Sequence, residues 1–186
     1  MTVSLPPTRF TPEDLLQLDD ERLYELVDGQ LVEKPMSSEA NEVAWIIGGH
    51  FFVFFSQTKA GKAYPEQAYQ CFPNDCKLIR RPDVSIVVAN RLAGVNKVGH
   101  VTIAPDIAIE VVSPNDKVFE LDEKIADYKS AGVRAIWVVD YKARTVRVIK
   151  PGAPTMELED HQTLTGEPVL AGFSVLVADL FPSAIA

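Results

Sequence analysis

Residues 107–112 have the sequence Ile-Ala-Ile-Glu-Val-Val, and residues 84–88 have the sequence Val-Ser-Ile-Val-Val. Both segments are rich in β-branched residues and almost wholly apolar, which is typical of strands that are buried on both faces of a sheet. Residues 135–139, Ala-Ile-Trp-Val-Val, form a third segment of the same kind. We therefore expect these three segments in one buried sheet.

A helix is expected over residues 117–131, between the strands at 107–112 and 135–139, with Gly132 ending it. Its inward side is predicted to carry Val118, Leu121, Ile125 and Tyr128. A strand, a crossover helix and a second strand produce one parallel pair, here residues 107–112 beside 135–139. With antiparallel neighbours, this predicts a mixed α/β sheet that is flanked by helices on both faces.

The N-terminal third of the sequence predicts a helix and a hairpin ahead of that sheet. Thr11 is expected to cap a short helix over residues 11–18. An Asp-Gly turn inside residues 24–33 indicates a hairpin. A long helix follows over residues 38–57, and its core face is predicted to carry Val43, Ile46, Ile47, Phe51, Phe54 and Phe55. Further extended segments are expected at residues 62–71 and 145–149, with two or three short ones after residue 151.

The 186-residue chain has no repeat and no long Gly/Ser linker, which predicts a single domain with a flexible tail at residues 1–10. No apolar run reaches the roughly 20 residues of a membrane span. The N-terminus does not resemble a secretory signal, and Cys71 and Cys76 are expected to be reduced thiols. We therefore expect a cytoplasmic protein without membrane attachment, zinc or an organic cofactor.

The formal net charge of −8 argues at first against nucleic acid as a partner, since non-specific binding depends on Lys and Arg. However, residues 71–150 carry 13 basic and 10 acidic residues, whereas both flanks are acidic. This basic block is either ordinary surface variation or a nucleic-acid face. In the second case the candidate phosphate contacts are Arg80, Arg81, Arg91, Lys117 and Lys142.

Two carboxylates stand where an apolar residue would be expected. Asp83 begins one buried strand, and Glu110 interrupts the most hydrophobic one. A buried carboxylate must take up a proton, pair with a cation or bind a metal. One interpretation is a buried ion pair or an exposed strand end. The other is a site for a divalent metal, where oxygen ligands favour Mg²⁺ or Mn²⁺.

Glu25 and Lys124 are candidates for the same site. The hairpin register places Glu25 opposite Val32, among apolar neighbours, although an edge strand could leave it in water. Lys124 lies at the margin of the predicted inward side of its helix, from which its ammonium group could reach Glu110. The alternative for Lys124 is a surface lysine whose stem covers apolar groups.

Five short motifs follow one another along the chain: Glu-Leu-Val-Asp-Gly-Gln-Leu-Val (25–32), Arg-Pro-Asp-Val (81–84), Pro-Asp-Ile-Ala-Ile-Glu-Val-Val-Ser-Pro (105–114), Glu-Lys-(x)₃-Tyr-(x)₃-Gly-Val (123–133) and Trp-Val-Val-Asp (137–140). Together they resemble the large putative restriction endonuclease family of the PD-(D/E)XK nuclease superfamily, over roughly residues 10–182. The resemblance implies a restriction-endonuclease-like core. It also implies an Mg²⁺- or Mn²⁺-dependent DNA endonuclease that acts as a homodimer.

The resemblance also implies roles for individual residues. Asp83, Glu110 and the backbone carbonyl of Val111 would hold the metal, and Glu25 would hold the metal or a metal-bound water. The lysine of the superfamily usually stands where this chain has Val112, so Lys124 on the next helix is the matching position. Two alternatives stay open: a structure-selective nuclease such as a junction resolvase, and a non-catalytic nucleic-acid-binding or assembly module with the same fold.

Overall fold

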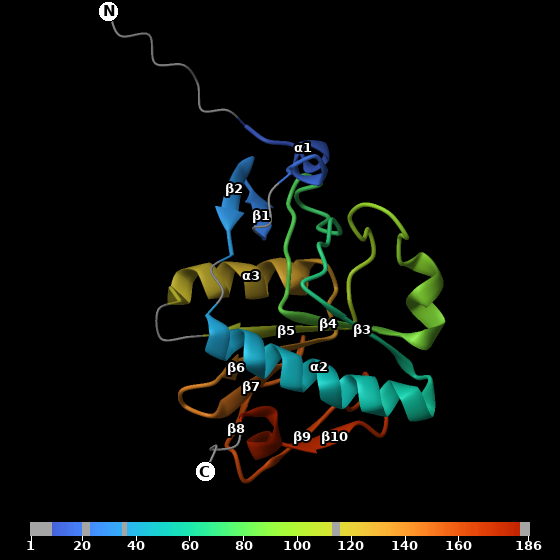
Figure 1. Ribbon diagram of the computed structural model, residues 1–186, viewed down its shortest axis with the longest axis vertical. Helices are drawn as coiled ribbons and strands as arrows, with labels where there is room; N and C mark the ends of the chain where they lie inside the picture. Colours follow the sequence, from blue (N-terminus) through green and yellow to red (C-terminus); the bar gives the residue numbers. More distant parts are fainter. Residues whose placement is uncertain (1–8, 20–22, 35–36, 113–115, 183–186) are drawn as a thin grey trace, which may run out of the picture.

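The computed structural model describes residues 9–19, 23–34, 37–112 and 116–182. Figure 1 shows the arrangement of the elements along the chain. In order they are α1 (Pro12–Leu16), β1 (Tyr24–Val27), β2 (Gln30–Glu33), α2 (Ser38–Thr58), β3 (Gly61–Pro65), β4 (Val84–Val88), the 3-10 helix η1 (Ala89–Gly94), β5 (Ile107–Val112), α3 (Val118–Ser130), β6 (Ala135–Asp140), β7 (Thr145–Ile149), β8 (Met156–Leu158), β9 (Thr163–Thr165), β10 (Ser174–Leu176) and the 3-10 helix η2 (Val177–Leu180).

The central sheet has six strands in the order β3-β4-β5-β6-β7-β8. Its strand pairs are antiparallel except β5 and β6, which run parallel on either side of the α3 crossover. This confirms the predicted mixed sheet and its parallel pair. Helices α2 and α3 lie on opposite faces of the sheet (Figure 1).

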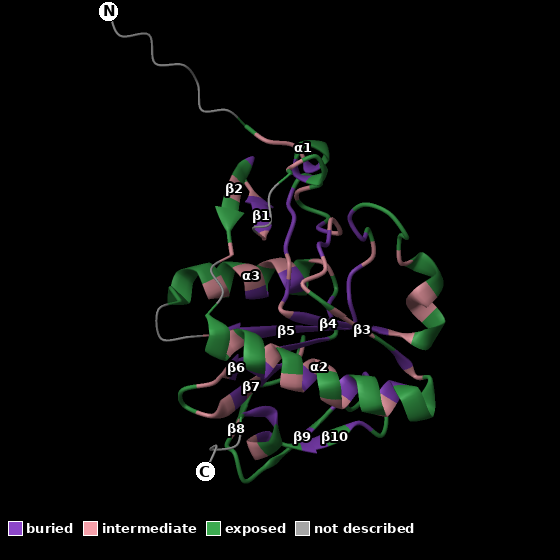
Figure 2. Ribbon diagram, viewed as in Figure 1, coloured by how far each residue is buried: buried purple, intermediate pink, exposed green. Residues whose placement is uncertain are grey.

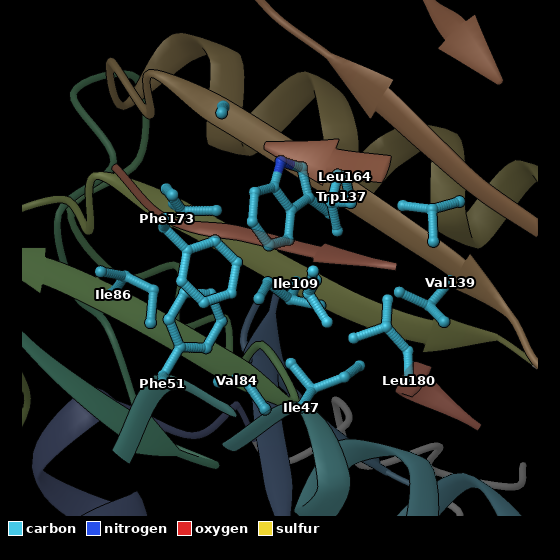
Figure 3. Close-up of a cluster of buried hydrophobic side chains, with 14 of the residues drawn as sticks. Ile47, Phe51, Val84, Ile86, Ile109, Trp137, Val139, Leu164, Phe173 and Leu180 are labelled. Carbon is cyan, nitrogen blue, oxygen red and sulfur yellow. The ribbon is translucent and has the colours of Figure 1, made fainter. Parts of the chain in front are cut away.

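The face that α2 covers is apolar. Val43, Ile47, Phe51 and Phe55 point from α2 toward alternate residues of the strands, among them Ile109 and Trp137. The β9–β10 segment closes the same cluster, and the ring centroids of Phe51 and Phe173 lie 4.3 Å apart. Figure 3 shows Ile47 and Phe51 of this cluster beside Ile109, Trp137 and Phe173 over the sheet. Figure 2 shows that the side of α2 away from the sheet is exposed.

The opposite face carries both apolar and charged groups. Ala108, Ile136 and Val138 pack against Ile125 and Tyr128 of α3. Side chains alternate along a strand, so Glu110 points to this face as Ala108 does. Asp83 precedes β4 and, by the same alternation, lies on this face with Ser85.

The N-terminal hairpin is fixed to the rest of the molecule through the loop before β4. Asp28 and Gly29 form the turn with positive φ angles of 50° and 74°. Leu26 exchanges two backbone hydrogen bonds with Ile79, at 3.0 and 2.9 Å. These bonds hold Glu25, the residue before Leu26, close to the start of β4.

Some predicted boundaries differ from the structure. Helix α1 ends at Leu16, and the extended segment expected over 62–71 is a strand only to Pro65. Val118 is 73% exposed because the first turn of α3 projects beyond the sheet, so it does not belong to the inward side. Phe10, placed in the predicted tail, packs against the hairpin cluster, while residues 1–8 lie outside the described residues. Among the described helices, none is long and apolar enough for a membrane span.

Candidate active site

Three carboxylates form a row across three neighbouring strands. Pro65 pairs with Val84, and Val84 pairs with Ile109. The next residues in this register are Glu66, Asp83 and Glu110, and the Glu66 backbone N–H donates to the Asp83 carbonyl at 3.1 Å. The strand pairing therefore brings together the two predicted metal-binding acids and adds Glu66 beside them.

Glu110 is buried and held by two side chains from α3. The Tyr128 hydroxyl donates to its Oε1 at 2.6 Å, and Lys124 Nζ lies 3.2 Å from its Oε2. Burial raises the pKa of Glu110, and Lys124 offsets only part of that effect. The predicted contact of Lys124 with Glu110 is present, and the lysine side chain is 17% exposed.

Glu25 is 2% exposed and bridges several basic groups. Its Oε2 accepts a hydrogen bond from Arg80 at 2.9 Å. Its Oε1 accepts the Arg81 backbone N–H at 2.9 Å and lies 3.2 Å from Lys124 Nζ. Burial alone would raise the pKa of Glu25, but Lys124 and Arg80 outweigh it and hold that pKa below its ordinary value. Glu25 is therefore an ionised anchor for Lys124.

Asp83 makes two short contacts through its carboxylate. Its Oδ2 accepts the Val111 backbone N–H at 2.6 Å, and its Oδ1 lies 2.7 Å from Lys34 Nζ. Lys34 also lies 3.0 Å from Glu66 Oε2. Burial raises the pKa of Glu66 to about 7, although Lys34 acts in the opposite direction.

One cleft of about 380 Å³ lies between the hairpin, the start of α2 and α3, and Asp83, Glu110 and Lys124 line it whereas Glu66 does not. Its charged lining residues are Glu25, Glu33, Asp83, Glu110, Asp116, Glu120, Lys34, Lys117 and Lys124. The six acids exceed the three lysines, so the cleft has a formal charge of −3. An anionic phosphate would be repelled from such a cleft, whereas a divalent cation would be attracted to it.

The oxygen donors of the cleft fit a hard cation such as Mg²⁺ or Mn²⁺ better than zinc. Asp83 and Glu110 offer carboxylate oxygens on one face, and Val111 brings backbone beside Asp83. Mg²⁺ commonly uses one or two carboxylates and completes its shell with water and substrate oxygens. Within the described residues, no three His, Cys, Asp or Glu side chains form a ready metal cage. The chain alone therefore supplies part of a coordination shell.

Three of the predicted phosphate contacts do not face this cleft. Arg80 is 5% exposed because its guanidinium is bonded to Glu25 and to Asp127 Oδ2, so it is part of the framework under the site. Arg81 is half-buried and donates to the backbone carbonyls of Glu66 and Tyr24. Arg91 pairs with Asp106 at 2.9 Å, beyond the end of β4 that is remote from Asp83.

The other two predicted contacts lie near the cleft. Lys117 lines its edge and pairs with Glu120 at 2.8 Å. Lys142 pairs with Glu39 at 2.9 Å, next to the start of α2 that also borders the cleft. Both lysines are more than half exposed, so their ammonium groups are accessible to a ligand.

Sequence reasoning missed Lys34, Glu66 and the hydroxyl of Tyr128. A signal for Lys34 was present in the hairpin, because alternation places residues 32 and 34 on the face that carries Glu25. Glu66 follows an edge strand whose register with β4 is not visible in the sequence. Tyr128 was assigned to the inward side of α3 by its spacing, but spacing does not reveal that its hydroxyl bonds Glu110.

Comparison with known proteins agrees with this fold. One solved structure, a putative nuclease belonging to DUF820 from Anabaena variabilis ATCC 29413, superposes with a TM-score of 0.77. The sequences are 21% identical, and the match covers 92% of this chain and 97% of that one. A search of curated proteins finds no match. Residues 12–179 match the Uma2 family, described as "Putative restriction endonuclease". The chain belongs to the Uma2 putative restriction endonuclease family.

Proposed function

We propose that the protein is a metal-dependent endonuclease that hydrolyses phosphodiester bonds in DNA. The observation that carries this proposal is the pairing of β4 with β5, which places Asp83 beside Glu110 in an acidic cleft with Lys124 on Glu110. The family description and the nuclease fold of the neighbour support the same class of activity.

Asp83, Glu110 and the carbonyl of Val111 would hold Mg²⁺ or Mn²⁺. Such an ion supplies a Lewis acid for the phosphate and lowers the pKa of a bound water. The protein orients Asp83 through the Val111 N–H and orients Glu110 through Tyr128. Because both carboxylates are fixed by hydrogen bonds, the two carboxylates themselves would need little reorganisation when the ion binds.

Lys124 is proposed to stabilise negative charge at the phosphate or to orient the attacking water. Glu25 was predicted to hold the metal or its water, but both of its oxygens contact basic groups of the chain. We therefore propose that Glu25 positions Lys124, whose Nζ lies 3.2 Å from Glu25 Oε1 and 3.2 Å from Glu110 Oε2. In this arrangement the ammonium group stays at the floor of the cleft with its charge intact.

A cleavage assay on plasmid DNA with Mg²⁺ or Mn²⁺ tests the proposal. Wild-type protein should nick or linearise the plasmid, and Glu110→Ala should abolish both cleavage and the metal-dependent rise in melting temperature. The matched control is Glu120→Gln, which removes one carboxylate from the cleft edge without touching Asp83 or Glu110. An equal metal response in wild type and Glu110→Ala would overturn the metal site.

The rival function is a non-catalytic nucleic-acid-binding or assembly module. It is favoured by the net charge of −8 and by the displaced lysine. Binding without cleavage across Mg²⁺, Mn²⁺ and several DNA forms would support this module. Selective cleavage of a four-way junction over linear duplex would instead support a structure-selective nuclease.

Lys117 and Lys142 are the proposed phosphate contacts at the mouth of the cleft. Each lost contact should reduce the slope of log K against log salt by about 0.9 on duplex DNA. The double variant Lys117→Gln/Lys142→Gln should therefore flatten that slope, while Arg91→Gln at the far end of β4 should leave it unchanged. An unchanged slope in the double variant would place the DNA face elsewhere.

We also propose that the chain is one domain that works in the cytoplasm. Cys71 and Cys76 are free thiols, as expected in a reducing compartment. The β9–β10 segment packs into the same apolar cluster as α2 and the sheet, which supports treating the described residues as one folding unit.

A homodimer is proposed through the outer face of α2. Trp45 and Phe52 are 80% and 75% exposed, and they lie two turns apart on the same side of this helix. A Cβ added at Gly49, between them, would meet nothing within 4 Å. Antiparallel packing of two copies would place each Trp45 near the partner's Phe52, as a two-fold interface requires.

The charges on α2 also favour a second copy of this chain as the partner at its outer face. Glu42 lies in the first half of α2, and Lys59 caps its C-terminal end. An antiparallel pair brings these opposite charges together at both ends of the contact, whereas a parallel pair would align like charges.

Sedimentation over a concentration series tests the dimer. Phe52→Glu should shift the protein toward the 20.5 kDa monomer, while Phe119→Glu, at an exposed phenylalanine of α3, should not. Trp137 is 2% exposed, so a concentration-dependent blue shift in emission would come from Trp45. A wild-type chain that stays monomeric at micromolar concentration would contradict the proposal.

A further inference from the structure

The Lys34 side chain occupies a pocket built of oxygen atoms. Its Nζ lies 2.7 Å from Asp83 Oδ1, 2.7 Å from the carbonyl oxygen of Arg81 and 3.0 Å from Glu66 Oε2. The side chain is only 9% exposed. Two carboxylates and a backbone carbonyl are also the ligand types of a hard divalent cation. Lys34 is therefore a cation, attached to the chain, in surroundings that would suit a metal ion.

The contact with Asp83 is the one that matters for metal binding. Asp83 Oδ2 accepts the Val111 N–H, so Oδ1 is the oxygen that becomes available to a metal when Lys34 moves away. A divalent ion at Asp83 and an ammonium group at the same oxygen would be a few ångströms apart, and like charges at that separation repel strongly. Both cations cannot keep short contacts with Asp83 Oδ1.

We propose that Lys34 is a built-in competitor that neutralises Asp83 in the metal-free protein and leaves it when a divalent ion binds. This inference rests on the proposed metal site and describes how the chain regulates it. Lys34 reduces the repulsion among the carboxylates of Glu66, Asp83 and Glu110, and in doing so it weakens the affinity of the site for metal. Glu66 is not one of the proposed metal ligands, so it can retain the ammonium group after Lys34 leaves Asp83.

Chemical labelling of the wild-type chain tests the displacement directly. Reductive dimethylation followed by peptide mapping should modify Lys34 slowly without metal, since its ammonium group is enclosed by three oxygens. Saturating Mg²⁺ should increase the labelling of Lys34 several-fold, with Lys117, which is 64% exposed, as the internal reference. Unchanged labelling of Lys34 with Mg²⁺ bound would overturn the displacement.

Titration with Mn²⁺ tests the competition. Lys34→Met should bind Mn²⁺ about 10-fold more tightly than wild type, the size of a modest coupling between two ligands of one site. The matched control is Lys117→Met, which removes the same charge from the cleft edge without touching Asp83. Metal-free melting curves and circular dichroism establish that each variant is folded, and Lys34→Gln provides a second neutral side chain.

The outcomes separate this inference from the proposed function. Equal Mn²⁺ affinity in wild type and Lys34→Met, with binding lost in Glu110→Ala, would overturn the competition and leave the metal site standing. Binding by Lys34→Met but not by wild type would support the competition and argue against metal-dependent cleavage by the natural chain. No Mn²⁺ binding by either protein would overturn both.

Discussion

The two faces of the central sheet are built from the same strands but contain different chemistry. Under α2 the buried groups are aliphatic and aromatic, with Phe51, Trp137 and Phe173 stacked on one another (Figure 3). Under α3 the apolar cluster borders Glu25, Arg80 and Glu110, all of which are buried. Because side chains alternate along a strand, one strand such as β5 contributes residues to both faces of the sheet.

The α2 face of the sheet contributes stability, whereas the α3 face carries the energetic cost of buried charges. Burial of apolar area stabilises the α2 face without requiring a particular partner for each group. On the α3 face every buried charge needs a specific partner, since desolvation of an ion costs several kcal/mol if it is left unpaired. The charged face is therefore the part of the molecule that a purely structural role would not require.

The largest expected loss of stability comes from the apolar face. Phe51 is fully buried, so Phe51→Ala should lower the free energy of unfolding by about 4 kcal/mol through the lost contacts and the cavity. Urea denaturation measures this change, and Phe119→Ala, at a position 59% exposed, serves as the control with little effect. Mn²⁺ affinity of the folded Phe51→Ala protein should remain unchanged. A change in affinity would mean that the faces are coupled.

Removing a partner from the charged face should cost somewhat less. Arg80→Met leaves Glu25 and Asp127 without their shared guanidinium, and breaking such a buried pair costs about 3 kcal/mol. The control is Lys142→Met, which breaks an exposed pair with Glu39 and should not measurably change the melting temperature. Equal melting temperatures for the two variants would show that the buried network does not contribute to stability.

The sequence predicted the local geometry of this charged face better than its long-range partners. The hairpin register of Glu25 with Val32 was predicted and is confirmed, because an Asp-Gly turn fixes it locally. Arg80 was named a candidate phosphate contact, and its buried partners Glu25 and Asp127 were missed because they lie 55 and 47 residues away in the chain. Pairing across such distances depends on how the hairpin docks onto the loop before β4, which no short-range pattern encodes.

The apolar face was more predictable because it needs only a periodic pattern. The spacing of six apolar residues indicated the buried side of α2, and four of them (Val43, Ile47, Phe51 and Phe55) are buried. The other two, Ile46 and Phe54, are only half-buried at the margin of that side. The same method failed at Val118, where spacing continued beyond the edge of the sheet. Periodicity identifies the side of a helix that faces inward, whereas the extent of the covering layer depends on the tertiary structure.

Lys124 allows the proposed catalytic role of the charged face to be separated from its structural role. Lys124→Met should reduce Mg²⁺-dependent cleavage by about 10²-fold, the size typical of one lost transition-state donor. A surface lysine at the helix margin would have little effect on stability, but Lys124 contacts two buried carboxylates, so some loss is now expected. Cleavage should be compared at saturating Mg²⁺ and below the melting transition. Full activity in Lys124→Met would remove this lysine from the proposed mechanism.

The smallest expected effect concerns the thiol of Cys71, on the α3 side of the sheet, where a nearby charge offsets the effect of burial only in part. Burial raises the pKa of Cys71 to about 12, and Arg91 offsets only part of this rise. The folded-state pKa lies above the ordinary value of 9.0, so any stability from the neutral thiol persists at low pH and is lost as pH rises from 9 through 12.

Alkylation of the two cysteines measures this suppression of the thiolate. At pH 8, alkylation requires the thiolate, so Cys71 should react with iodoacetamide at least about 10-fold more slowly than exposed Cys76. In urea both thiols should react at similar rates, which provides the control. Equal rates in the folded protein would show that burial on the α3 face does not suppress ionisation of Cys71, and would contradict the difference drawn between the two faces.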